Sequence, residues 1–154
     1  VLENITLGDP SISEAEAVAA ARRVNADRFI SRLPDQYHER VYERGATLST
    51  GQRQLLSFAR ALAYNPAILI LDEATSSIDT ETEQLIQDAI GKLTQGRTTI
   101  VIAHRLSTIQ HADRILVLHD GEIRETGTHD ALLKKGGLYY DLYRLQWVGD
   151  RDAQ

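Results

Sequence analysis

The chain has 154 residues, of which 42% are hydrophobic and 25% charged, as expected for a single globular domain. Its formal net charge of -5, without any block of like charges, argues against nucleic acid and anionic membrane surfaces as partners. The absence of cysteine excludes disulfides and thiolate metal sites, and the apolar runs are too short for a membrane span. Because the chain also lacks methionine and starts at Val1, we expect it to be a piece of a longer product.

The first 66 residues have the pattern of a helical segment. Ser13 and Glu16 form a Ser-x-x-Glu capping box, which predicts that a helix starts there and continues through Ala-rich sequence. A second, short helix is predicted near residues 26–33, where a proline follows. A third is predicted over residues 50–64, because apolar residues recur there at helical spacing.

After residue 66 the pattern becomes that of an α/β segment. Short apolar runs at residues 67–71 and 98–103 predict two buried parallel strands. A helix is predicted between them, over residues 80–93, with Asp79 as its N-cap. This order of elements predicts a right-handed crossover connection.

The remaining residues predict a hairpin followed by two helices. A third strand is expected over residues 114–119, and Asp120-Gly121 is typical of a tight turn into a further strand at 122–126. Beyond that hairpin, two amphipathic helices are predicted, separated by Gly136-Gly137.

Charged side chains follow two of the predicted parallel strands. Asp72 and Glu73 end the first strand, and His104 follows the second. If the strands are neighbours, two carboxylates and an imidazole meet at one edge of the sheet, which suits metal-bound phosphate and an activated water. The alternative is that the acids only cap the next loop.

A second candidate site lies at the start of the helix predicted over residues 50–64. Ser49 and Gln52 form a Ser-x-x-Gln capping box, and Gly51 between them allows another molecule to approach the backbone closely. A helix start has unpaired N–H groups and about half a positive charge, which favours a phosphate ligand. The alternative is an ordinary capped helix without a ligand.

Taken together, these motifs resemble those of the ATP-binding cassette ATPases in order and spacing. Residues 48–52, LSTGQ, are similar to that family's signature motif, and the strand ending at Glu73 to its Walker B strand. Residues 76–79 are similar to its D-loop, and His104 to its switch histidine. The resemblance implies an α/β fold of the P-loop NTPase (RecA-like) class: part of a parallel sheet with an α-helical subdomain.

The resemblance also implies a role for each matching residue, with ATP and Mg²⁺ as ligands. Asp72 is expected to hold the Mg²⁺ shell, through water, while Glu73 orients and deprotonates the attacking water and His104 contacts the γ-phosphate. The signature residues are expected to contact the nucleotide of a second, facing domain, with Asp79 at the seam between the domains. The signature residues in question are Leu48, Ser49, Thr50, Gly51 and Gln52.

Two features refine the expected partners. Glu43-Arg44-Gly45 is similar to the exporter segment that touches the transmembrane partner, although Tyr42 replaces the usual glycine. Thr50 also stands where the family usually has glycine, while Glu73 is intact. We therefore expect a nucleotide-binding domain at the cytoplasmic face of the cell membrane, with a second such domain and a transmembrane domain as partners and no nucleic acid. Thr50 suggests that the facing domain is a different chain.

The family pattern divides the chain into three parts. Residues 1–66 are expected to hold the end of the Q-loop region and the helical subdomain, 67–127 the RecA-like part, and 128–154 the C-terminal helices. No G-x-x-x-x-G-K-[ST] loop occurs in the sequence, so the Walker A half is expected upstream and the chain alone to be inactive. Loss of the Walker A half is expected to uncover a sheet edge and an apolar face.

Two other classes of function remain open at this point. A soluble cassette ATPase of the DNA-repair kind would carry a long coiled coil before the signature, whereas only short helices precede it here. A non-catalytic dimerisation or regulatory module is the other alternative.

Overall fold

A computed structural model of the chain describes residues 1–42, 47–72, 79–103 and 109–151. The chain forms two compact units, each with its own core. The first unit holds Val1–Leu71 and continues through the next helix to Ile100, and the second holds Asp72 and the residues from Val101 onward. The three-part division at residues 66 and 127 stays a prediction.

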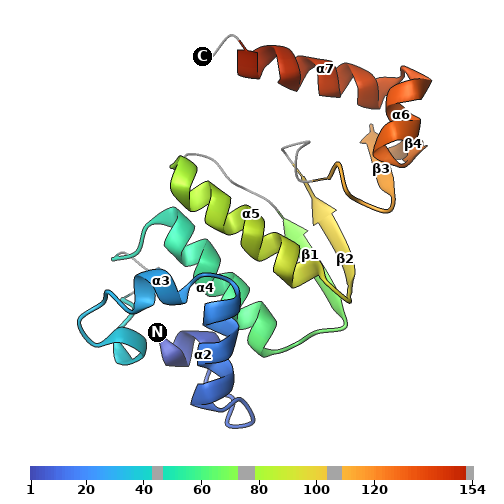
Figure 1. Cartoon of the computed structure of the whole chain (residues 1–154). Helices are drawn as coiled ribbons and strands as arrows, with labels where there is room; N and C mark the ends of the chain where they lie inside the picture. The colour runs from blue at the N-terminus through green and yellow to red at the C-terminus, as the bar shows by residue number, and fades with distance from the viewer. Residues whose placement is uncertain (43–46, 73–78, 104–108, 152–154) are drawn as a thin grey trace. The chain divides into compact units, whose positions relative to one another are not determined.

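The first unit is mainly helical (Figure 1). Its elements are α1 (Leu2–Thr6), α2 (Glu14–Arg23), α3 (Asp27–Ile30), the short 3₁₀ helix η1 (Gln36–His38), α4 (Thr50–Ala63), β1 (Ile68–Asp72), α5 (Thr80–Thr94) and the first residues of β2 (Thr98–Ile102). The sequence predicts the helices that start near residues 13, 26 and 50 and the strands that start near residues 67 and 98. The one-turn helix α1 was not predicted. No side chain caps its start, so the sequence contains no capping motif for it.

Local capping explains where the longer helices begin. The Ser13 side chain accepts from the Glu16 N–H at the start of α2, and the Glu16 side chain accepts in turn from the Ser13 N–H, as predicted. Asp79 caps α5, as predicted, by accepting from the Thr82 N–H at 2.9 Å. Because each signal lies within four consecutive residues, the sequence is enough to locate it.

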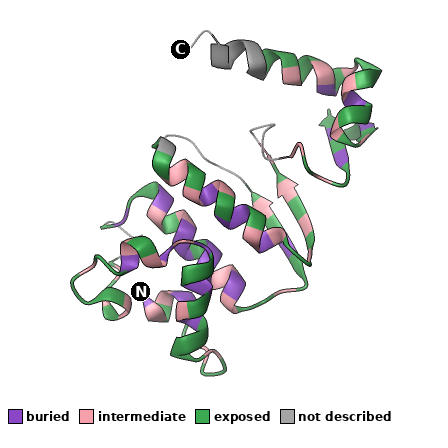
Figure 2. Ribbon diagram, viewed as in Figure 1, coloured by how far each residue is buried: buried purple, intermediate pink, exposed green. Residues whose placement is uncertain are grey.

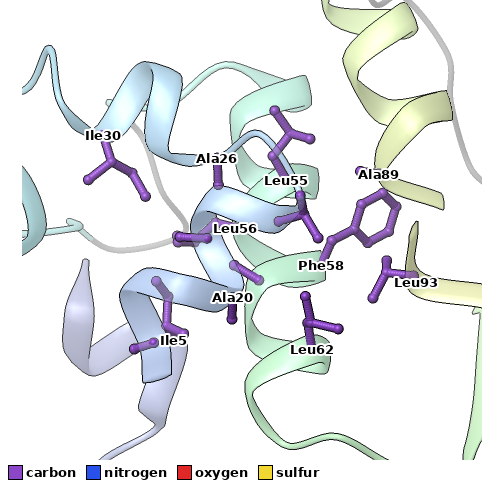
Figure 3. Packing of buried hydrophobic residues seen from close by; sticks show 14 of the residues in the cluster. Ile5, Ala20, Ala26, Ile30, Leu55, Leu56, Phe58, Leu62, Ala89 and Leu93 are labelled. Carbon is purple, nitrogen blue, oxygen red and sulfur yellow. The ribbon is translucent and has the colours of Figure 1, made fainter. Parts of the chain in front are cut away.

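Helix α4 lies at the centre of the first core, between α1 and α2 on one side and α5 on the other (Figure 3). Leu56 faces the N-terminal helices, whereas the ring of Phe58 points toward Ala89 and Leu93 of α5. Helix α1 is further tied to α4 because the Tyr64 hydroxyl donates to the Thr6 carbonyl at 2.7 Å. The packing of α4 therefore joins all the longer helices of this unit.

Strands β1 and β2 pair as a two-stranded sheet and run in the same direction (Figure 1). The prediction that both strands are fully buried is wrong. Leu69 joins the core, but Ile68 and Ile70 are 62% and 64% exposed, and Ile100 and Ile102 of β2 are exposed as well (Figure 2). Within the first unit, Leu69 packs with residues of α4 and α5 on one face of the pair, and the exposed isoleucines lie on the other face.

This difference between the two faces can be measured with matched substitutions of isoleucine. Ile86 of α5 is 1% exposed, so Ile86→Ala is expected to lower the free energy of unfolding by about 2–5 kcal/mol, through lost burial and the cavity left behind. Ile70→Ala, on the exposed face, is expected to cost less than about 1 kcal/mol. Urea unfolding of the purified chain tests both, and equal losses would contradict the burial described here.

The second unit is a hairpin packed against two helices. Strand β3 (Ile115–His119) pairs antiparallel with β4 (Glu122–Gly127), and α6 (His129–Lys135) and α7 (Leu138–Arg151) follow. Asp120 and Gly121 have φ values of 52° and 75°, which is the left-handed geometry of a tight hairpin turn, as predicted. Gly136 ends α6 with φ 66°, also as predicted.

A buried carboxylate holds the start of α7 against β4. The Glu125 side chain is 6% exposed, accepts from the Tyr139 N–H at 3.0 Å and lies 3.4 Å from the Lys135 ammonium. A Cβ atom at residue 137 would lie 1.9 Å from the Glu125 carboxylate, so any larger residue there would displace that carboxylate. The Tyr139 N–H, followed by Lys135, lowers the pKa of Glu125 below its ordinary value.

The lowered pKa predicts how this unit responds to acid. A carboxyl with a lower pKa in the folded state stabilises the fold above its ordinary pKa of 4.5, and this contribution disappears as the pH falls through the lowered value. Glu125→Gln is therefore expected to lower the urea midpoint at pH 7 and to flatten its decline toward pH 3. Glu122→Gln, exposed on the same strand, is the control and is expected to change neither. An unchanged pH profile in Glu125→Gln would contradict this role.

Candidate nucleotide site

The start of α4 is held by the capping box predicted from the sequence. The Ser49 hydroxyl accepts from the Gln52 N–H at 3.2 Å, and the Gln52 side-chain oxygen accepts from the Ser49 N–H at 2.9 Å. These bonds satisfy two of the four N–H groups that a helix start leaves without an intrahelical acceptor. The other two belong to Thr50 and Gly51. The side chains of Ser49 and Thr50 are exposed.

Gly51 is buried, and its predicted contact with a nucleotide stays a prediction. It lies on the face of α4 that continues through Leu55, Phe58 and Leu62, at helical spacing, into the core. The core face of the helix thus extends to its first turn. An approaching anion would meet Ser49 and Thr50 first.

Leu48 is buried as well, and its predicted contact with a nucleotide stays a prediction. Its side chain is 5% exposed and belongs to the first core. An apolar residue directly before the N-cap commonly packs down onto the helix it precedes, and this fixes the direction of the chain entering it. Only the main chain of Leu48 takes part in the turn, because its carbonyl accepts from the Arg53 guanidinium at 2.7 Å.

Arg53 is a member of this turn that the motif alone did not single out. Its guanidinium also donates to the Thr50 hydroxyl at 3.0 Å, so it spans the residues on both sides of Ser49. The spacing from Thr50 to Arg53, three residues within one helix, is the signal that could have identified the contact. The turn from Leu48 to Arg53 is therefore closed by four hydrogen bonds within the chain.

Asp79 and Asp72 lie at the ends of their elements, as the motifs require. Asp79 is exposed, and the N–H of Thr82 lowers the pKa of its carboxyl, so it is ionised at the start of α5. Asp72 is the last residue of β1 and is exposed. The neighbouring strand β2 ends at Ile102 and runs parallel to β1, so the two carboxyl ends lie at the same edge of the sheet.

Several predicted site residues lie outside the described residues. Glu73, His104, residues 43–45 and residues 76–78 belong to this group, so their predicted roles remain predictions. Within the described ranges no group of three or more histidines and carboxylates is arranged to hold a metal ion. The same ranges contain no helix with the length and apolarity that crossing a membrane requires.

Comparison with known proteins identifies the family. The profile of the ABC transporter family matches residues 1–76. The chain is 56% identical over 147 residues to the uncharacterized ABC transporter ATP-binding protein YknV of Bacillus subtilis, and covers 24% of that protein. It is 57% identical over 143 residues to the probable multidrug resistance ATP-binding/permease protein YheH of the same organism, covering 21% of it. These matches span 96% and 93% of this chain.

A solved structure agrees with the sequence matches. The structure of a bacterial Atm1-family ABC exporter with ATP bound aligns with a TM-score of 0.83 and 46% identity, over 94% of this chain and 25% of the exporter chain. The chain therefore belongs to the ABC transporter family, and its fold is part of an ABC nucleotide-binding domain of the predicted P-loop NTPase class. It spans about a quarter of the length of the relatives it matches.

The capping box predicts a stability effect at two matched positions. Ser49→Ala and Ser13→Ala each remove a serine cap from a reciprocal pair, and each is expected to lower the free energy of unfolding by about 1 kcal/mol. Urea unfolding of the two variants measures this. An unchanged midpoint in Ser49→Ala would mean that the box does not stabilise the signature turn.

Proposed function

We propose that this chain is the signature-bearing part of the nucleotide-binding domain of an ATP-driven exporter, in which ATP binding and hydrolysis drive transport through a membrane. The observation that carries the proposal is the exposed Ser49–Thr50 edge of α4, in a chain whose fold matches an exporter with ATP bound. The relative YheH, which is named as an ATP-binding/permease protein, supports the coupling to a membrane partner.

The roles proposed for the individual residues follow from the negative charge that phosphoryl transfer must stabilise. Phosphoryl transfer needs charge stabilisation and an oriented water more than covalent help from the protein. Glu73 would orient and deprotonate that water, and His104 would contact the γ-phosphate. Ser49, together with the helix start behind it, would bind the phosphate of ATP held by a facing domain. Asp79 would lie at the seam between the domains.

Among the described residues, Asp72 is suited to hold the water shell of a magnesium ion. Asp72 presents an exposed carboxylate at the carboxyl end of β1, and carboxylate oxygen is a ligand type that Mg²⁺ takes in proteins. Bound there, the ion would supply positive charge that neutralises the phosphates. Asp72 would hold its water shell.

The proposed partners follow from the same arrangement. A site that uses the signature turn of one domain and the phosphate loop of another requires two domains, and a transmembrane domain would receive the resulting motion. We place the assembly at the cytoplasmic face of the cell membrane. Thr50 in the signature supports a facing domain of different sequence, which would make the pair a heterodimer.

The isolated chain is proposed to be inactive, because the lysine-bearing phosphate loop is absent from its sequence. A soluble cassette ATPase is disfavoured by the likeness to YheH, which is named as an ATP-binding/permease protein.

Substitutions in the full-length protein test the proposal. Glu73→Gln is expected to slow ATP hydrolysis at least about a hundredfold while ATP binding persists, because it removes the base and leaves the side-chain shape. Ser49→Ala is expected to slow hydrolysis as well, whereas Ser13→Ala, with an equivalent cap on α2, is the control and keeps the wild-type rate. The assays are steady-state ATPase rates and nucleotide binding.

Two results would contradict the proposal. One is a steady ATPase rate from the purified 154-residue chain that Glu73→Gln abolishes, because the chain would then need no phosphate loop from elsewhere. The other is a full-length protein whose ATPase rate is the same in Ser49→Ala and Ser13→Ala.

A further inference from the structure

The turn after α1 holds a leucine in an unfavourable backbone conformation. Leu7 and Gly8 have φ values of 51° and 74°, and across them the Asp9 N–H donates to the Thr6 carbonyl at 2.9 Å. Positive φ at both central residues is typical of turns that favour glycine, asparagine and aspartate. Gly8 meets that preference, whereas the Cβ of a leucine makes the left-handed conformation costly. Among the described non-glycine residues with positive φ, Leu7 alone has a hydrocarbon side chain.

This conformation does not serve the packing of the chain itself. The side chain of Leu7 is 61% exposed and belongs to neither of the two cores. An apolar side chain left in water forgoes the free energy that its burial would give. Asparagine or glycine at position 7 would avoid both the strain and the exposure. A strained residue that the fold does not need indicates a contact outside it.

Hydrogen bonds to Thr6 hold the turn in place. Thr6 is buried, and its carbonyl accepts from the Tyr64 hydroxyl at 2.7 Å as well as from the Asp9 N–H. Its own hydroxyl accepts from the Gly8 N–H at 3.3 Å. Tyr64 is the C-cap residue of α4, so the turn is attached to the central helix of the first unit. Leu7 is therefore presented to solvent in a fixed position.

We propose that Leu7 is an apolar anchor, which inserts into an apolar pocket on a cytoplasmic segment of the transmembrane domain. The inference rests on the proposed function, because it assumes such a partner. Burial in the partner's pocket recovers the free energy that the exposed side chain lacks in the chain alone. Because the turn is already fixed, little conformational freedom is lost when Leu7 docks.

The place of Leu7 along α4 disfavours the facing nucleotide-binding domain as the partner. The Ser49–Thr50 edge proposed to contact that domain lies at the start of α4, whereas Tyr64, which holds the Leu7 turn, lies at the end. A helix of 14 residues is about 20 Å long. The seam proposed at Ser49 therefore does not account for the exposed side chain of Leu7.

The Walker A half of the same domain is disfavoured as well. The apolar face that this half is expected to cover belongs to β1 and β2, on the side turned away from α4 and α5. Helix α1, which leads into Leu7, instead packs against α4 on the side opposite α5 (Figure 3). The transmembrane domain remains. The chain covers 21% of YheH, which is named as an ATP-binding/permease protein, so most of such a protein is available to supply the contact.

Alkylation of a cysteine at position 7 of the full-length protein tests whether a partner covers it. Leu7→Cys and the control Gln95→Cys, exposed at the C-cap of α5, are each made in a background without other cysteines. In the folded, membrane-embedded protein Leu7→Cys is expected to react with a maleimide at least about tenfold more slowly than Gln95→Cys, because covered thiols are inert. In unfolded protein the two variants are expected to react equally fast.

Cross-linking identifies what covers position 7. The photoreactive residue p-benzoylphenylalanine is placed at position 7 or, as the control, at position 95 of the full-length protein. After illumination, mass spectrometry of the digested protein is expected to show position 7 linked to a cytoplasmic segment of the transmembrane domain. Position 95 is expected to give no such link.

The outcomes separate this inference from the proposed function. Equal alkylation of Leu7→Cys and Gln95→Cys in the folded protein would overturn the inference. So would the lack of a link from position 7 to the transmembrane domain, or a link to the facing domain or the Walker A half instead. The ATPase rates of Ser49→Ala and Glu73→Gln test the proposed function independently of these results. A full-length protein without a transmembrane domain would overturn both.

Discussion

The packing of α4 is the constraint on which the first unit depends. One stripe of the helix, from Gly51 through Leu55 and Phe58 to Leu62, is buried against α1, α2 and α5. Burying a side chain such as Leu55 or Phe58 is worth about 1.5–3 kcal/mol, so the stripe strongly favours one rotation of the helix about its axis. That rotation decides which residues of the signature turn face water. Ser49 and Thr50 do, while Leu48 and Gly51 do not.

The signature turn thus combines two functions in six residues. Its apolar members, Leu48 and Gly51, belong to the core and hold the turn in place, while its polar members are bonded to one another at an exposed edge. Because hydrogen bonds within the chain already hold the side chains of Ser49, Gln52 and Arg53, the turn is ordered without a ligand. A phosphate bound there would meet a preformed surface of hydroxyl groups and positive charge, which is what binding across two domains requires.

Local features were predictable from the sequence, and features that depend on distant residues were not. The boxes at Ser13 and Ser49, the cap at Asp79 and the turn at Asp120-Gly121 each depend on neighbours within about three residues. Ile68 and Ile70 were expected to be buried because their strand is apolar on both faces, but burial depends on what covers each face. The burial of Gly51 follows from its place on the apolar stripe of α4, which the motif alone does not show. Glu73 and His104, the residues proposed for the chemistry itself, still rest on the resemblance, since they lie outside the described residues.

The central claim is that the Ser49–Thr50 edge of α4 completes a nucleotide site whose other half belongs to a facing domain. A structure of the full-length protein with Glu73→Gln and ATP bound tests it most directly. We expect the Ser49 hydroxyl to lie within about 3 Å of a terminal phosphate oxygen of ATP held on the facing domain's phosphate loop. A closed, ATP-bound pair in which Ser49 faces solvent, with no phosphate in hydrogen-bonding reach, would contradict it.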